Sequence, residues 1–449
     1  MMKKLTSLLL VMFLLIPAFS GCAGNSNPAV APGSDSGTGT TGTSTTETGA
    51  AGTDAPSTPV ELTFYYPTQT AGALAAGMEK IVSEFNTSHA GVKVTPVFTG
   101  SYKATAEKAM TSIQANNAPN VVLSGMLDIV NYVDVDAVED ITPYLEKEGS
   151  AFVNDFVDGF WGNFRFNGAL VGVPFQHSTP VLYYNKKMLA AAGLNAENPP
   201  TTWEGMIEAV RAVKTANGKV IPLEFPADVW ILEAITYSSS GTLVKNTTTP
   251  TFDSAEAVAA LDFLSTLTHV EKSVMIRNWG DAAEDFIAES CAMMFNTTGN
   301  LGAVSTGASF DWNVATLPVK TSPSFSYGGG GMIMLKGQSE EEREASWEFI
   351  KYMTSPEVSA QWAIISGYYP VRKSSGSLPA MQEYYAKNPQ VKQAADMLQY
   401  ATAQWFTDNY WDVYACMQTA LDEVLIAGGT SAKDALSAAQ KNALSALSK

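Results

Sequence analysis

The sequence predicts an α/β protein with two lobes, and two observations carry this prediction. Segments with the patterns of strands and of helices alternate along the chain, which favours sheets that are covered by helices. The folded part runs from Val60 to Lys449, roughly 390 residues, which is more than one hydrophobic core normally serves. We therefore expect two lobes, each a mixed, mostly parallel sheet flanked by helices.

The alternation is clearest at the start of the folded part. Val60 to Tyr66 has the apolar and aromatic composition of a strand, and 71–86 places apolar residues at helical spacing. Residues 91–98 alternate valines with polar residues, which predicts a second strand. A helix at 101–116 and extended chain at 120–124 complete the first strand-helix-strand series.

The remainder of the chain continues the series. Its expected elements are strands near 170–174, 180–185, 290–295 and 332–335, a helix opened by Thr202 and Trp203, and helices near 227–238, 254–269 and 340–353. The glycine run 328–331 precedes the last of these strands and allows very close backbone approach. It is not followed by the lysine and hydroxyl pair of a nucleotide-binding loop. The end of the chain is expected to be mostly helical.

The N-terminus has the pattern of a targeting segment. Lys3 and Lys4 precede an apolar run at 5–19 that is short for a membrane span, and Ser20-Gly21-Cys22 follows. This resembles a bacterial lipoprotein signal peptide covering residues 1–21, with cleavage before Cys22 and acylation (a palmitate or similar chain) of that cysteine. The alternative is a plain secretory signal with an incidental cysteine.

Residues 22–59 read as a linker. They are nearly all glycine, serine, threonine, alanine and proline, so they cannot bury enough apolar surface to fold. A chain of this composition behaves as a flexible leash. We expect a protein anchored by lipid to the outer face of the cell membrane, which is the periplasmic side if the host has two membranes.

Charge and cysteine content exclude several classes of function. The chain has 27 basic and 44 acidic residues and a formal charge of -17, which argues against nucleic-acid and anionic-membrane surfaces. Three scattered histidines give no metal-binding spacing, so no metal or cofactor is expected. If Cys22 carries lipid, Cys291 and Cys416 remain, and we expect buried free thiols rather than a disulfide.

A series of motifs resembles one known family. The motifs are VPFQHSTPVLYYNK at 173–186, AAGL at 191–194, PPTTW at 199–203, CAMM at 291–294 and SGYYPV at 366–371. In this order they resemble the family 1 extracellular solute-binding proteins of ABC importers, with the glycerol-3-phosphate-binding members as the nearest match. The resemblance covers roughly residues 60–445.

The resemblance implies a maltose-binding-protein-like fold, the type II periplasmic-binding-protein architecture, with a ligand cleft between the lobes. It places lobe 1 at 60–178 plus about 332–380, and lobe 2 at 179–331 plus about 381–449. Residues 179–185 and 328–335 would be crossover strands. It also implies a monomer without enzymatic activity that delivers a small solute to the permease subunits of an ABC importer.

The family's ligand contacts carry over only in part. The matching positions are Tyr102, Ser178, Trp230, Gly329 and Tyr368, and Thr298 stands where the relative has a serine. A glutamate expected near Met126 is missing, and Asp128 is a candidate substitute. The segment expected to supply an arginine, 405–411, has no positive charge and offers Trp405, Asp408 and Asn409 instead.

The missing arginine decides between ligand classes. Arginine holds phosphate through paired charge-assisted hydrogen bonds, and burying a dianion without such a partner costs several kcal/mol. Trp405, Tyr410 and Trp411 resemble the aromatic walls on which sugars lie in this family. Trp279, which precedes Gly280, is a candidate for lining the cleft, although a structural role is favoured for it. We expect a neutral saccharide or polyol, with glycerol 3-phosphate or a glycerophosphodiester as the alternative.

An enzyme is the rival class, because surface lipoproteins include glycosidases that use a pair of carboxylates. No nucleophile-elbow motif or metal-ligand cluster supports this reading. A surface-anchored glycan-active enzyme therefore remains the less favoured alternative.

Overall fold

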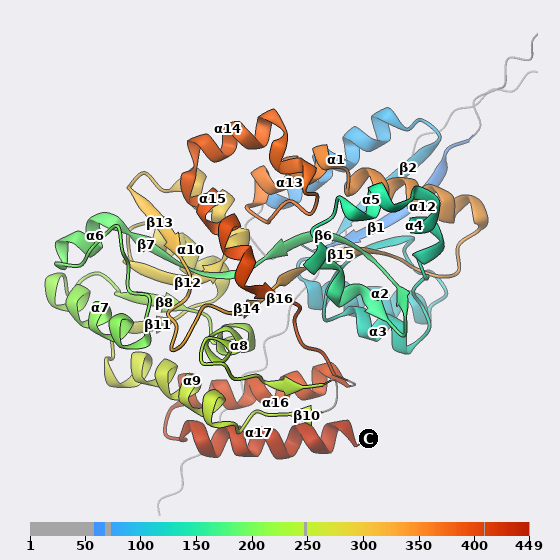
Figure 1. Cartoon of the computed structure of the whole chain (residues 1–449). Coiled ribbons are helices and arrows are strands. Elements are labelled where there is room, and N and C mark those ends of the chain that lie inside the picture. The colour runs from blue at the N-terminus through green and yellow to red at the C-terminus, as the bar shows by residue number, and fades with distance from the viewer. Residues whose placement is uncertain (1–57, 68–72, 247–248, 408, 449) are drawn as a thin grey trace, which may run out of the picture. The chain divides into compact units, whose positions relative to one another are not determined.

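The computed structural model describes residues 58–67, 73–246, 249–407 and 409–448, which belong to one unit, Pro56–Lys449. The predicted signal peptide, Cys22, most of the linker and Asp408 lie outside the described residues. The structure contains two five-stranded sheets, and Figure 1 labels most of their strands and most of the helices around them. Among the described residues, no helix is both long and apolar enough to cross a membrane.

The first sheet has the strand order β2-β1-β3-β15-β6. Strands β1 (Val60–Tyr66), β2 (Val92–Phe98) and β3 (Val121–Gly125) are parallel. Strand β15 (Gly328–Met334) runs antiparallel to both β3 and β6 (Val173–Ser178). The sheet thus combines an N-terminal parallel part with a strand from more than 150 residues further along the chain.

The second sheet has the order β11-β8-β12-β7-β13. Strands β11 (Val274–Ile276), β8 (Leu223–Phe225) and β12 (Met293–Thr297) are parallel. Strand β7 (Pro180–Asn185) is antiparallel to β12 and to β13 (Trp312–Ala315). Only Thr179 separates β6 in the first sheet from β7 in the second, so the chain crosses between the sheets at that residue.

Helices flank both sheets. The helices are α1 (Ala73–Ser88), α2 (Tyr102–Gln114), α3 (Ile129–Asp134), α4 (Thr142–Glu148), α5 (Ser150–Asn154), α6 (Lys186–Ala191), α7 (Trp203–Ala216), α8 (Val229–Tyr237), α9 (Ala255–Ser265), α10 (Trp279–Ile287), α11 (Leu301–Gly307), α12 (Glu340–Met353), α13 (Pro356–Ser366), α14 (Pro379–Lys387), α15 (Pro389–Asp396), α16 (Tyr410–Leu421) and α17 (Ala432–Leu447). Helices α1, α2 and α12 pack on the first sheet, and α6, α8, α10 and α15 pack on the second. The C-terminal pair α16 and α17 packs on α8 and α9.

Short two-residue strands complete the fold. They are β4 (Arg165–Phe166), β5 (Ala169–Leu170), β9 (Val244–Lys245), β10 (Thr249–Pro250), β14 (Phe325–Ser326) and β16 (Ala401–Thr402). Strands β14 and β16 pair in parallel, and β14 ends just before β15 begins in the chain.

Two predicted strands differ from the observed ones. The strand expected at 170–174 is divided between β5 and β6, with Val171 and Gly172 outside both, and a Cβ on Gly172 would stand 2.9 Å from Phe164. The strand expected at 332–335 begins earlier, at Gly328, because the glycines themselves pair in the sheet. A Cβ on Gly331 would stand 2.3 Å from Phe164, so glycine is what allows β15 to pack this closely.

The two remaining cysteines have different environments. Cys291 is fully buried, and burial raises the pKa of its thiol. Cys416 is only half-buried, and its Sγ donates to the Asp412 carbonyl at 3.1 Å. The expectation that both thiols are buried is therefore correct for Cys291 alone.

Candidate functional site

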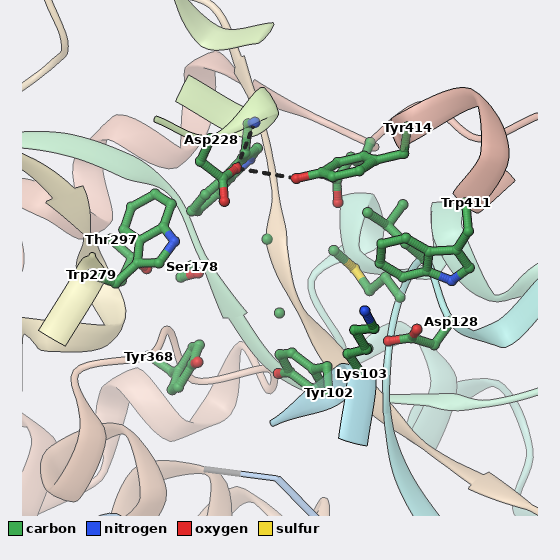
Figure 2. Close-up of a pocket in the computed structure, with 17 residues that line it drawn as sticks. Tyr102, Lys103, Asp128, Ser178, Asp228, Trp279, Thr297, Tyr368, Trp411 and Tyr414 are labelled. Atoms are coloured by element: carbon green, nitrogen blue, oxygen red, sulfur yellow. Dashed lines mark hydrogen bonds between the residues drawn. The ribbon is translucent and has the colours of Figure 1, made fainter. Parts of the chain in front are cut away.

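A cavity of about 210 Å³ lies where segments of both sheets meet. Its walls come from the start of α2, the turn after β3, the end of β6, the starts of α8, α10 and α16, and the glycines of β15. Figure 2 shows its polar and aromatic side chains converging from these segments. The volume is below the ~300 Å³ at which typical ligand pockets begin, which suits a small ligand.

The topology of the second sheet explains one wall. Strands β8 and β11 are parallel neighbours, so their carboxyl ends meet at the same edge of the sheet. Helix α8 starts after β8 and helix α10 starts after β11. The tryptophans at these helix starts, Trp230 and Trp279, consequently meet with ring centroids 5.6 Å apart and planes inclined by 50°.

Asp228 is the N-cap of α8 and also lines the cavity. Its Oδ1 caps α8 by accepting from the Trp230 backbone amide at 2.8 Å, and it also accepts from the Tyr414 hydroxyl at 3.4 Å (Figure 2). Burial raises the pKa of the Asp228 carboxyl, and hydrogen bonds from Trp230, Trp279 and Tyr414 oppose that shift. The cap thus fixes a carboxyl group in the wall of the cavity.

The first sheet contributes a tyrosine, a lysine and a second carboxyl group. Ser101 caps α2 by accepting from the Ala104 amide, which places Tyr102 and Lys103 in the first turn beside the cavity. Asp128 is 3% exposed, and burial raises its pKa to about 7, against a lowering effect of the Trp411 side chain. Asp128 is therefore poised between its neutral and charged forms at neutral pH.

Tyr102 is held by a short chain of hydrogen bonds. The Gln176 side-chain amide donates to the Tyr102 hydroxyl, and Gln176 Oε1 accepts from Trp362 Nε1 at 2.9 Å. Gln176 belongs to β6, two residues before Ser178 at the cavity. These hydrogen bonds fix the position of the Tyr102 side chain in the cavity wall.

The end of β6 and the start of β15 form another wall of the cavity. Ser178 ends β6 and pairs with Gly328, while Gly329 pairs with His177 and has φ 118°. A Cβ on Gly328 would stand 2.7 Å from Trp230, so the indole packs directly on the backbone. The absence of a side chain at Gly328 therefore allows the Trp230 indole to contact the backbone of β15.

Six of the predicted contact residues line this cavity: Tyr102, Asp128, Ser178, Trp230, Gly329 and Tyr368. Their contact with a ligand stays a prediction. Trp411, from the predicted aromatic segment, also lines it.

Three predicted contact residues lie elsewhere. Thr298 is fully buried, and its hydroxyl accepts from the Thr179 amide at 3.1 Å, at the crossing between the sheets. Trp405 packs against Phe252 and Tyr410 ahead of α16 rather than in the cavity wall. Asn409 donates to the Ala446 carbonyl at 3.0 Å, away from the cavity.

Sequence reasoning missed several lining residues, among them Lys103, Asp228 and Tyr414. Trp279, for which the sequence favours a structural role over lining the cleft, also lines the cavity, and the pairing of β8 with β11 explains its place. Lys103 brings a positive charge that the segment 405–411 lacks, although its side chain is largely exposed and lies 3.9 Å from Glu107. The adjacency of Lys103 to Tyr102 at a helix start was the one available signal.

The chemistry of the cavity is that of reversible binding. Aromatic faces offer stacking, while carboxyl, hydroxyl and backbone groups offer hydrogen bonds to a polyhydroxylated molecule. In the described part of the chain, no group of three or more histidine, cysteine, aspartate or glutamate side chains is arranged to hold a metal ion.

Comparison with known proteins identifies the family and the fold of the chain. A family model described as bacterial extracellular solute-binding protein matches residues 80–393. The chain is 26% identical over 337 residues to the sn-glycerol-3-phosphate-binding periplasmic protein UgpB of Pectobacterium atrosepticum, covering 71% of this chain and 75% of that protein. UgpB of Escherichia coli is 25% identical over 336 residues, covering 71% and 76%.

Solved structures share the fold. UgpB from Mycobacterium tuberculosis in complex with glycerophosphocholine has a TM-score of 0.78 and 23% identity, covering 87% of this chain and 99% of that one. Maltose-bound T. maritima MalE3 has a TM-score of 0.76 and 22% identity, covering 85% and 98%. These likenesses confirm the predicted maltose-binding-like fold. On the family match, the chain belongs to the bacterial extracellular solute-binding proteins.

Proposed function

We propose that the chain is the substrate-binding lipoprotein of an ABC importer and captures an extracellular neutral carbohydrate or polyol. One observation carries the ligand class: the cavity combines the indoles of Trp230, Trp279 and Trp411 with the carboxyl groups of Asp128 and Asp228. Aromatic faces stack on sugar rings, and carboxyl groups accept hydrogen bonds from hydroxyls.

Capture follows from the position of the cavity. A solute there touches side chains carried by both sheets, so it stabilises the arrangement in which the two walls are close. Shifting such an equilibrium from mostly open to mostly closed requires about 5.5 kcal/mol of differential affinity. The closed form then docks on the permease and releases the unaltered solute, so we propose no enzymatic activity for the chain.

Electrostatics favour a neutral solute over a phosphate. Two carboxyl groups face the cavity, and they repel an anion when charged. The single lysine, Lys103, is largely exposed, so its attraction is screened by solvent.

The second candidate is a glycerol 3-phosphate or glycerophosphodiester-binding protein of the same transporter class. Lys103 is the observation that favours it, because it gives the cavity the cation that a phosphate needs. The relatives named for glycerol 3-phosphate, and the structure with glycerophosphocholine, support the same candidate.

A calorimetric screen separates the two candidates. The probes are mono- and oligosaccharides, polyols, glycerol 3-phosphate and glycerophosphocholine. We expect a saccharide or polyol to bind, and Trp230→Ala to weaken that binding about 30- to 150-fold, equivalent to about 2 to 3 kcal/mol, because a stacking wall is lost. Trp161→Ala, at a tryptophan outside the cavity lining, serves as the control.

Two outcomes contradict the neutral-solute proposal. One is tight binding of a phosphate probe that Lys103→Met weakens at least tenfold, while no saccharide or polyol binds. The other is a bound saccharide whose affinity is unaffected by Trp230→Ala. If the protein released reducing sugar from a glycan, that result would instead support the alternative of a surface-anchored glycan-active enzyme.

The membrane anchor is a further part of the proposal and depends on Cys22. Each buried methylene of an acyl chain contributes about 0.8 kcal/mol, so two or more chains hold the protein at the membrane. We expect Cys22→Ser to lose incorporation of labelled palmitate and to move the protein from the membrane to the soluble fraction. Cys416→Ser is the matched control and keeps both. Persistent labelling of the Cys22→Ser protein would refute acylation at this residue.

A further inference from the structure

The indole of Trp230 is held from behind the cavity by Ser326. Trp230 Nε1 donates a bifurcated hydrogen bond, to the Ser326 hydroxyl at 3.0 Å and to the Ser326 carbonyl oxygen at 3.2 Å. Ser326 ends β14, two residues before β15 begins at Gly328. The hydrogen bond therefore links a cavity wall on α8 to the end of β14, just before β15.

Glu233 holds the serine in turn. It lies three residues after Trp230 on α8, is 0% exposed, and its Oε2 accepts from the Ser326 hydroxyl at 2.7 Å. An indole N–H only donates, whereas a serine hydroxyl both accepts and donates, so the donors run from Trp230 through Ser326 to Glu233. A carboxylate at the end of this series polarises the hydroxyl and strengthens its bond to the indole.

The ring has little room to turn away. It packs directly on Gly328, where even a Cβ would stand 2.7 Å from Trp230 Cζ2, and its centroid lies 5.6 Å from that of Trp279. Packing restricts the position of the ring, while the hydrogen bond selects its orientation. A buried carboxyl group is costly, so its place behind a cavity wall calls for an explanation beyond packing.

We propose that Glu233 is a positioning residue for solute binding: acting through Ser326, it fixes the orientation in which Trp230 presents its indole to the solute. The inference rests on the proposed function in one respect, namely that Trp230 is a wall of the solute cavity. The hydrogen-bond series itself does not depend on which solute binds.

The network responds to pH. Burial raises the pKa of Glu233 to about 7, and hydrogen bonds from Ser326, Tyr237 and the Trp405 backbone oppose the shift. The other titratable groups that face it, from α8 and α16, are Asp228, Tyr237, Tyr410 and Tyr414. The pKa of each tyrosine is raised by burial, so these three stay neutral near pH 7. Glu233 loses its proton as the pH rises through about 7, and the bond to Ser326 strengthens.

The indole N–H signal of Trp230 in ¹⁵N NMR of the full-length protein tests this series without any solute. Trp230→Phe assigns the signal by removing it. We expect the wild-type signal to titrate with a midpoint near pH 7, and to lose that titration in Glu233→Gln and in Ser326→Ala. Glu224→Gln is the matched control, because Glu224 is also fully buried with a pKa raised to about 7 but belongs to β8 and makes no bond to Trp230.

Affinity provides the second measurement, with maltose and glycerophosphocholine as probes. For a probe that binds, Glu233→Gln and Ser326→Ala weaken binding about 2- to 10-fold, as expected for one hydrogen bond, while Glu224→Gln leaves it unchanged. A Trp230 signal that titrates unaltered in Glu233→Gln, or unchanged affinity in both variants, overturns the inference. If neither maltose nor glycerophosphocholine binds, that result counts against the proposed solute classes. The NMR titration, which needs no solute, then decides alone whether Glu233 acts on Trp230 through Ser326.

Discussion

Replacing Gly329 with alanine is expected to reduce the free energy of unfolding by more than about 3 kcal/mol and the Tm by at least about 4 °C. Gly329 has φ 118°, a conformation that residues with a side chain rarely adopt, and its Cβ would stand 2.1 Å from the Gln176 carbonyl oxygen. The clash is with backbone of the paired strand β6, so no rotamer change relieves it. Urea denaturation and calorimetry measure the loss.

Gly337→Ala separates backbone strain from the clash. Gly337 also has a positive φ, 93°, but no atom lies within 4 Å of its Cβ position. We expect this variant to lose only about 1–2 kcal/mol, the cost of the left-handed conformation alone. Equal losses in the two variants would contradict the close approach of β15 and β6.

Removing the side chain of Arg372 is the second large effect, with an expected loss of about 3–5 kcal/mol for Arg372→Ala. The guanidinium is 3% exposed, and it donates to the carbonyl oxygens of Thr354 and Phe152 at 2.7 Å each. It also lies 3.6 Å from the ring centroid of Phe156. The variant leaves the buried Thr354 carbonyl and the partly buried Phe152 carbonyl without these donors, and an unsatisfied buried group costs about 1–3 kcal/mol.

The neighbouring residue provides the control. Lys373 pairs with Asp158 at 3.0 Å, but its side chain is 47% exposed, so Lys373→Ala is expected to cost less than about 1 kcal/mol. Arg372→Lys keeps the charge and loses the forked donor geometry, so it recovers only part of the stability. Urea denaturation of the three variants checks the order. An Arg372→Ala protein as stable as Lys373→Ala would show that the buried contacts contribute little.

Much of the site was open to prediction because its residues stand in motifs. Tyr102 follows a capping serine, Trp230 follows the capping Asp228, and Ser178 and Tyr368 lie in the conspicuous runs at 173–186 and 366–371. Local signals of this kind mark helix starts and strand ends, where binding residues commonly lie. Six of the ten predicted contact residues consequently line the cavity.

The rest of the site depends on how helix ends are placed in three dimensions. Trp405 and Trp411 are equally plausible in sequence, yet α16 begins at Tyr410, so Trp411 lies in its first turn at the cavity while Trp405 packs on Phe252. Thr298 carries a suitable hydroxyl, but the crossing between the sheets uses that hydroxyl to accept from Thr179. The spacing of residues along the chain predicts neither the position of Trp411 at the cavity nor the hydrogen bond of Thr298 to Thr179.

The sequence by itself determined the α/β pattern, the family and the aromatic character of the site, because periodicity and motifs are local properties of the chain. Tertiary structure alone decided that Trp279 and Lys103 join the cavity and that Glu233 stands behind Trp230. Those neighbours are set by the order of strands in each sheet: β8 beside β11 brings together helix starts that are about 50 residues apart.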